Sequence, residues 1–103
     1  MKDMNVTITK ETEKTLASVE GRIDTTNAEE FQKEISVLLD EEKPVFEIDC
    51  SGLEYTSSQG LRVFLMLQKA VSAKNGSMVL LKMQPQVKEV FDITGFSNII
   101  EIR

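Results

Sequence analysis

The sequence predicts an α/β fold in which a mixed β-sheet carries helices mainly on one face. The N-terminal segment alternates apolar and polar side chains as the two strands of a hairpin do, and later strand-like segments are separated by stretches with helical periodicity. Residues 46–50 also alternate, whereas a sheet covered on both faces would show a continuous apolar run there. The 103 residues give room for one domain with one core.

The N-terminal strands are indicated by alternation. Met4, Val6 and Ile8 alternate with polar residues, which is the period of a half-buried strand. A second strand is expected from Thr15 to Glu20, after a short polar turn. The two strands therefore predict an antiparallel hairpin.

The first helix is predicted from a capping pattern and an apolar stripe. Thr26 and Glu29 match a capping box, in which each side chain accepts from an otherwise unpaired backbone N–H. The helix is expected to begin here and to end before Pro44. The stripe repeats at helical spacing and consists of Ala28, Phe31, Ile35, Leu38 and Leu39.

The middle of the chain predicts a strand, a turn and a second helix. The alternating strand at residues 46–50 is followed by Ser51–Ser58, which is rich in small polar residues and is expected to be a turn. Apolar residues then indicate a helix over Ser58–Lys74. Gly76 is expected to end it in a left-handed conformation.

The C-terminal part predicts two further strands around a third helix. Ser77–Lys82 contains an apolar run without a polar face, which favours an interior strand. Pro85 is expected to open a helix that finishes at Gly95, and the isoleucines within residues 99–102 form a last strand. The order β-β-α-β-α-β-α-β favours parallel, right-handed connections between the later strands.

Composition and charge exclude several classes of function. The net charge of −5, without a clustered basic patch, disfavours nucleic acid or an anionic membrane surface as partner. No signal-peptide core or bilayer-length apolar segment is found, so membrane insertion is not expected. The single cysteine, Cys50, fits a reducing compartment, and we expect the protein in the cytoplasm.

The absence of histidine narrows the chemistry further. It removes the commonest general base, the commonest zinc ligand and any Ser-His or Cys-His pair. The acidic residues are scattered, so neither a metal site nor a cofactor is expected. Cys50 alternates with apolar neighbours and is interpreted as a small buried hydrophobe. The chain is therefore not expected to be an enzyme.

The candidate functional segment is Tyr55–Arg62, where three consecutive hydroxyl residues precede a helix. A helix N-terminus favours an anion by about 0.3–1 kcal/mol when exposed, so a phosphate would be well placed. Thr56 with Gln59 also matches a capping box, and that interpretation stays open. Gly60 in the first helical turn lowers the stability of the helix by up to about 1 kcal/mol relative to alanine. Close approach of another backbone would justify this cost.

Four segments in the right order resemble the STAS domains, and most closely the bacterial anti-sigma factor antagonists. The segments are Gly21-Arg22-Ile23-Asp24, residues 46–55, Ser57-Ser58-Gln59-Gly60-Leu61 and residues 85–95. The resemblance covers essentially the whole chain, so residues 1–103 are expected to form one STAS domain.

The resemblance implies a phosphorylation switch. In that family an anti-sigma factor with serine kinase activity phosphorylates a serine two residues before a Gly-Leu pair, which selects Ser58. The unphosphorylated form binds the anti-sigma factor and releases the sigma factor, and a separate phosphatase restores it. Asp24 matches an acidic position near that serine. The family's phosphorylated members usually carry aspartate before the acceptor, whereas this chain has Ser57, which is the runner-up acceptor.

One docking surface is expected from these segments. It comprises Asp24, Thr56, Ser57, Ser58, Gln59, Gly60, Arg62, Val63 and Met66. The second helix is apolar almost all round, so Val63 and Met66 either contact a partner or pack laterally against neighbouring helices. The alternative function is a STAS accessory subunit of a transporter or signalling assembly. A nucleotide-hydrolysing enzyme is disfavoured because the P-loop lysine and glycine pattern is missing.

Overall fold

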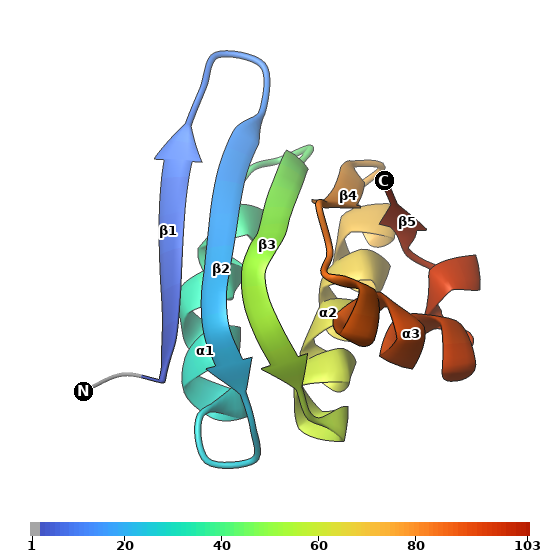
Figure 1. Ribbon diagram of the computed structural model, residues 1–103. Helices are drawn as coiled ribbons and strands as arrows, with labels where there is room; N and C mark the ends of the chain where they lie inside the picture. The colour runs from blue at the N-terminus through green and yellow to red at the C-terminus, as the bar shows by residue number, and fades with distance from the viewer. Residues whose placement is uncertain (1–2) are drawn as a thin grey trace.

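The computed structural model describes residues 3–103 and contains one five-stranded sheet with three helices (Figure 1). The strands are β1 (Met4–Lys10), β2 (Thr15–Ile23), β3 (Val45–Thr56), β4 (Ser77–Leu81) and β5 (Glu101–Ile102), in the spatial order β1-β2-β3-β4-β5. The helices are α1 (Ala28–Ile35), α2 (Ser58–Ala73) and α3 (Pro85–Ile93), with 3-10 turns η1 (Ser36–Leu39) and η2 (Phe96–Asn98). The predicted mixed α/β fold is confirmed.

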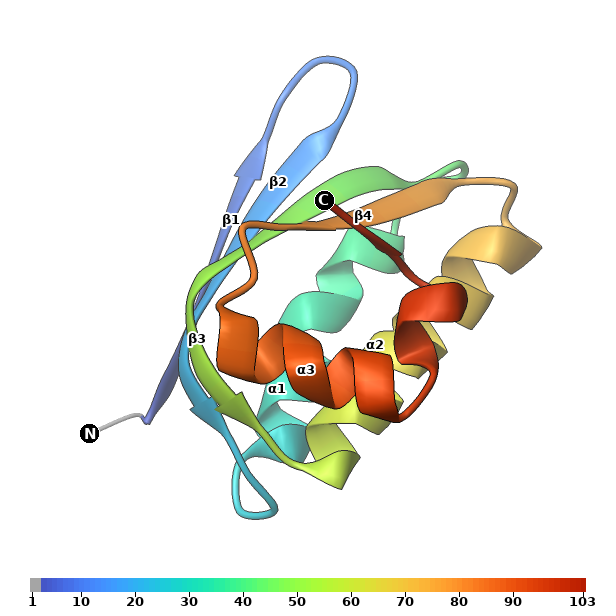
Figure 2. The same ribbon diagram turned by 45° about the vertical axis from the view of Figure 1, so that its right-hand side comes forward.

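The sheet begins with a hairpin and continues by helical crossovers. β1 and β2 pair antiparallel, while every later pair of neighbours is parallel. Each crossover advances by one strand in the same direction, and connections of one hand then place all their helices on the same face. Figure 2 shows α1, α2 and α3 together on one side of the sheet. Within residues 3–103 no helix covers the other face, as the alternation in β3 predicted.

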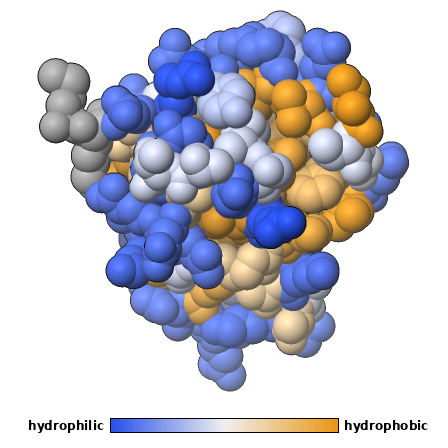
Figure 3. Space-filling view, turned by 90° about the horizontal axis from the view of Figure 1, so that it is seen from below, coloured by the Kyte–Doolittle hydropathy of each residue, from blue (hydrophilic) through white to orange (hydrophobic). Residues whose placement is uncertain are grey.

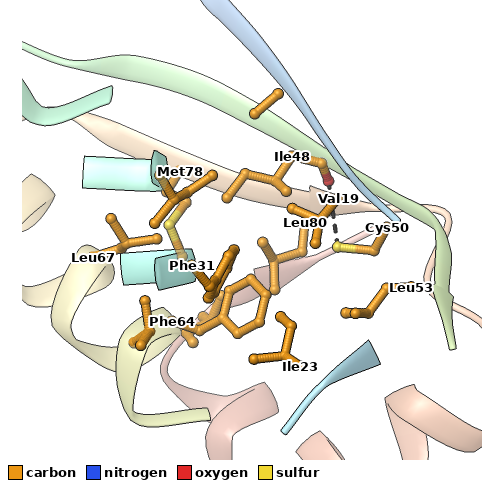
Figure 4. Packing of buried hydrophobic residues seen from close by; sticks show 14 of the residues in the cluster. Val19, Ile23, Phe31, Ile48, Cys50, Leu53, Phe64, Leu67, Met78 and Leu80 are labelled. Atoms are coloured by element: carbon orange, nitrogen blue, oxygen red, sulfur yellow. Dashed lines mark hydrogen bonds between the residues drawn. The ribbon is translucent and has the colours of Figure 1, made fainter. Parts of the chain in front are cut away.

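Aromatic side chains connect the three helices in the core between them and the sheet. The ring of Phe31 in α1 lies 5.3 Å from that of Phe64 in α2, and Phe64 lies 5.5 Å from Phe91 in α3. All three rings are fully buried. Val19 and Ile48, from the sheet, belong to the same buried cluster as these rings (Figure 4). Tilted and edge-to-face ring pairs of this kind contribute about 0.5–1.5 kcal/mol beyond their buried area.

The predicted turn over Ser51–Ser58 is wrong, because β3 continues through these residues to Thr56. Its register against β2 shifts twice, between Ser18 and Glu20 and between Gly21 and Arg22. At each shift β3 contributes an extra residue, as in a β-bulge. Its buried positions are therefore spaced irregularly, at 46, 48, 50, 53 and 56. The strict alternation that would have revealed a long strand is lost.

The end of α2 and the start of the last strand differ in detail from the prediction. Asn75, with φ of 59°, takes the left-handed conformation expected of Gly76. A side chain at Gly76 would instead overlap the carbonyl group of Pro44. The last strand is shorter than expected, since Ile99 and Ile100 precede β5. Ile100 is nevertheless buried in the core.

Candidate functional site

The candidate segment lies where β3 ends and α2 begins. Ser57 is the N-cap of α2, with extended backbone, and its Oγ accepts a hydrogen bond of 3.2 Å from the N–H of Gly60. The predicted capping box of Thr56 with Gln59 is therefore wrong by one residue, because Thr56 is still part of β3. The cap satisfies one of the four backbone donors that every helix start leaves unpaired.

The three consecutive hydroxyl groups have different environments. Thr56 and Ser57 are buried, with 5% and 7% of their surface exposed, and the Ser57 oxygen is occupied by the cap. Ser58 is exposed and is the first residue of α2. Its hydroxyl donates only a long bond of 3.3 Å to Oε1 of its neighbour Gln59. Of the three oxygens, that of Ser58 is the one that another protein can reach.

The loop after β2 lies beside this junction. The N–H of Ser57 donates a bond of 2.7 Å to the carbonyl oxygen of Ile23, the residue before Asp24. Oδ1 of Asp24 accepts from the hydroxyl of Thr26 at 2.6 Å and from its N–H at 2.9 Å. These bonds, the hydroxyl bond above all, lower the pKa of Asp24 below its ordinary value. The expected neighbourhood of the Asp24 loop and the Ser57-Ser58 segment is present.

The predicted capping box of the first helix is wrong. α1 begins at Ala28, its N-cap residue is Asn27, and no side chain caps it. The hydroxyl of Thr26 is engaged by Asp24. The Asn27 side chain stabilises the loop from within, since its Oδ1 accepts from the N–H of Asp24 at 2.9 Å and its Nδ2 donates to the carbonyl of Arg22. Thr26 and Asn27 thus hold the turn that presents Asp24, while Glu29 lies in the first turn of α1.

Gly60 is required by packing at the start of α2. A Cβ at this position would lie 2.8 Å from Cγ2 of Ile23 and closer still to the hydroxyl of Thr56. The close neighbours are therefore side chains, whereas the sequence suggested another backbone. Absence of a side chain at Gly60 lets the first turn of α2 pack closely against the ends of β2 and β3.

A groove of about 460 Å³ runs between α1 and α2 and reaches Gln59, the residue after Ser58. It is lined by Thr25, Ala28, Glu29, Gln32, Gln59, Arg62, Val63 and Met66. Val63 is only 5% exposed, so it packs mainly within the protein, while Met66 is half-buried. The structure thus brings together Gln59, Arg62, Val63 and Met66 from the expected docking surface.

Four groove residues were not part of the expected docking surface, namely Thr25, Ala28, Glu29 and Gln32. Glu29 and Gln32 are three positions apart and share one face of α1. That spacing indicates a polar face of a helix, but it does not reveal which helix lies beside it. From the sequence, Glu29 was expected only as half of a capping box.

The end of the molecule that carries Ser58 is hydrophilic over much of its surface. Figure 3 views this end from below, and hydrophobic side chains gather on the right, the side on which Figure 1 places α3. Two large apolar residues of the C-terminal segment are strongly exposed: Ile93 at the end of α3 and Ile99 after η2. Neither was part of the expected docking surface.

Other candidate chemistry is limited within residues 3–103. Cys50 is fully buried, and burial raises the pKa of its thiol to about 12, in keeping with the predicted small hydrophobe. No group of three or more acidic or cysteine side chains in this part of the chain could hold a metal ion. None of its helices has both the length and the apolar character needed to cross a bilayer.

Comparison with known proteins identifies the family. The sequence model of the STAS domain matches residues 4–103. The chain belongs to the STAS domain family. Among STAS relatives, the BtrV protein of Bordetella bronchiseptica is 33% identical over 99 residues, covering 96% of this chain and 85% of that protein. The anti-sigma-B factor antagonist of Listeria monocytogenes is 33% identical over 85 residues, covering 82% and 75%.

Solved structures share this STAS fold at lower identity. An anti-sigma factor antagonist from Mycobacterium paratuberculosis superposes with a TM-score of 0.85 at 19% identity, covering 96% of this chain and 84% of that one. The anti-sigma factor antagonist SpoIIAA in its unphosphorylated form gives 0.77 at 19% identity, covering 96% and 88%. SpoIIAA of Bacillus in its phosphorylated form gives 0.71, covering 96% and 91%. The same fold therefore occurs with and without phosphate in SpoIIAA.

Proposed function

We propose that this protein is an anti-sigma factor antagonist of the cytoplasm that acts by binding. Its unphosphorylated form binds an anti-sigma factor with serine kinase activity and thereby releases the sigma factor. Phosphorylation of Ser58 ends the binding, and a separate phosphatase restores it. The observation that carries the proposal is the exposed hydroxyl of Ser58 at the first position of α2. The name of the Listeria relative, an anti-sigma-B factor antagonist, supports the sigma-factor context.

The covalent step is a phosphoryl transfer. The Oγ of Ser58 forms a bond to the terminal phosphorus of a nucleoside triphosphate held by the kinase, and the bond to the leaving nucleoside diphosphate breaks. The hydroxyl proton passes to a base of the kinase or to water. The phosphatase reverses the modification by hydrolysis, which yields inorganic phosphate and the free hydroxyl.

The position of Ser58 explains why a phosphate would change binding without changing the fold. The side chain is exposed and makes only one long hydrogen bond. A phosphoserine adds about −1.5 to −2 charges, which disfavours a close, desolvated contact at this surface. Asp24 and Glu29 already contribute acidic groups nearby, so an acidic partner surface would be repelled further.

Ser57 is the weaker candidate for phosphorylation. Its oxygen is buried and accepts the capping bond from Gly60, so modification would break the start of α2. Serine and aspartate are comparable N-cap residues. Ser57 can therefore perform the structural role of the aspartate that phosphorylated family members usually carry there.

The test uses the purified chain and the purified kinase-type anti-sigma factor encoded by the same genome. We expect the wild type and Ser58→Ala to bind, with Ser58→Asp at least tenfold weaker. Incubation with the kinase and ATP should add one phosphate to the wild type and none to Ser58→Ala, as measured by intact mass. Equal binding by all three forms would reject the switch. No binding by any form would favour a STAS subunit of a transporter or another signalling assembly.

A further inference from the structure

Arg62 is a basic side chain placed one helical turn after Ser58. Both residues are exposed and both lie in α2. Residues four apart in a helix have Cβ atoms about 5–6 Å from each other. Long helical side chains lean toward the N-terminus, so the Arg62 stem is directed over the turn that contains Ser58. An acidic group placed four residues before a basic one is the more favourable orientation of such a pair.

The guanidinium of Arg62 is available for a new partner. Within residues 3–103 it makes no ion pair or side-chain hydrogen bond. It lines the groove between α1 and α2 opposite Glu29, yet the two are not paired. The other nearby cation, Arg22, is engaged over the ring of Tyr55 at 4.5 Å. Arg62 is thus the cation best placed to meet a phosphate on Ser58.

We propose that Arg62 captures the phosphate of phosphorylated Ser58 and thereby withdraws its positive charge from the groove. This inference rests on the proposed phosphorylation of Ser58. Guanidinium binds phosphate through paired, charge-assisted hydrogen bonds, which are about twice as strong as neutral ones. Phosphorylation then changes the docking surface of this protein in two ways. A dianion is added, and the guanidinium of Arg62 turns away from Glu29. Before modification, Arg62 is free to meet an acidic group of the partner.

The experiment uses the full chain with phosphoserine placed at position 58 during translation, so that no kinase is required. The second ionisation of the phosphate is followed by ³¹P NMR as the pH is varied. Arg62 lowers the phosphate pKa, whereas Asp24 and Glu29 raise it, and these acids are unchanged in all variants. We expect the phosphate of the wild type to bind its proton about twofold to fivefold more weakly than that of Arg62→Gln.

Lys69→Gln is the matched control, because it removes the same charge from an exposed position of the same helix about three turns from Ser58. It should titrate like the wild type. The Nε–H signal of Arg62 should also shift on phosphorylation and follow the phosphate pKa. Equal phosphate titration in the wild type and Arg62→Gln would overturn the inference.

The two proposals fail separately. If the wild type and Arg62→Gln titrate alike while Ser58→Asp still loses the anti-sigma factor, the switch stands and Arg62 is not its phosphate ligand. If the titrations differ but no kinase-type partner binds any form, the intramolecular pair stands and the sigma-factor function does not.

Discussion

The N–H of Ser57 donates a hydrogen bond of 2.7 Å to the carbonyl oxygen of Ile23. This bond joins the residue that caps α2 to the last residue of β2. Asp24 and Ser58 follow these two residues directly, so two segments far apart in the sequence present their polar side chains at one end of the sheet. The geometry of the candidate site is thereby tied to the pairing of β2 with β3.

Loss of the N-cap should destabilise the protein. Ser57→Ala removes the acceptor for the N–H of Gly60. We expect the free energy of unfolding to fall by about 1 kcal/mol, measured by urea denaturation. Ser57→Asp should restore most of it, because aspartate caps equally well. Ser58→Ala should have little effect, and an equal loss in Ser58→Ala would contradict the assigned cap.

Gly60→Ala tests the close packing at the start of α2. Helix propensity alone predicts stabilisation by up to about 1 kcal/mol. The added methyl group would meet Ile23 and Thr56, and overpacking of this kind costs about 1–3 kcal/mol. We therefore expect a net loss of stability, read as a lower urea midpoint. A more stable variant would show that these neighbours move aside readily. Lys69→Ala, at an exposed position of the same helix, should change the midpoint little.

Strand and helix order could be predicted from the sequence because the apolar side chains of most elements follow a single recognisable pattern. The hairpin, the apolar stripe of α1 and the interior strand β4 all carry a regular pattern. β3 does not, since its bulges change which residues face the core, and its second half was assigned to a turn. A bulge depends on the partner strand and leaves no period of its own in the sequence.

The sequence selected Ser58 and the Asp24 loop as candidates, but it did not predict their contacts. Ser58 and the Asp24 loop were expected together on the strength of a family resemblance. The cap was placed on Thr56 because a hydroxyl followed by glutamine three residues later satisfies the local pattern. Only the length of β3 decides that Ser57 is the cap. Likewise, the hydroxyl of Thr26 donates to Asp24, two residues earlier, and no side chain caps α1.

Cys50 should be chemically inert in the folded protein. It is fully buried, its pKa is raised to about 12, and the thiolate is the reactive form. We expect no alkylation by iodoacetamide at pH 8 within the time that labels the urea-unfolded chain completely, measured by intact mass. Fast labelling without denaturant would mean that the β3 region opens readily. An added exposed cysteine, Lys69→Cys, provides the positive control for the reagent.

The carboxyl group of Asp24 should titrate below its ordinary pKa of 3.8 because of Thr26. A depressed folded-state pKa gives stability that is present above the unfolded pKa, near 3.9, and is lost as the pH falls through the folded value.

Thr26→Val removes the hydroxyl bond, which is the largest cause of the shift. We therefore expect NMR titration of the side-chain carboxyl to show a higher Asp24 pKa in Thr26→Val than in the wild type. The variant should also lose less stability as the pH falls below the unfolded pKa. Thr25→Val, at the neighbouring position, should leave the titration unchanged. An unchanged pKa in Thr26→Val would show that the backbone N–H bonds alone hold this carboxylate.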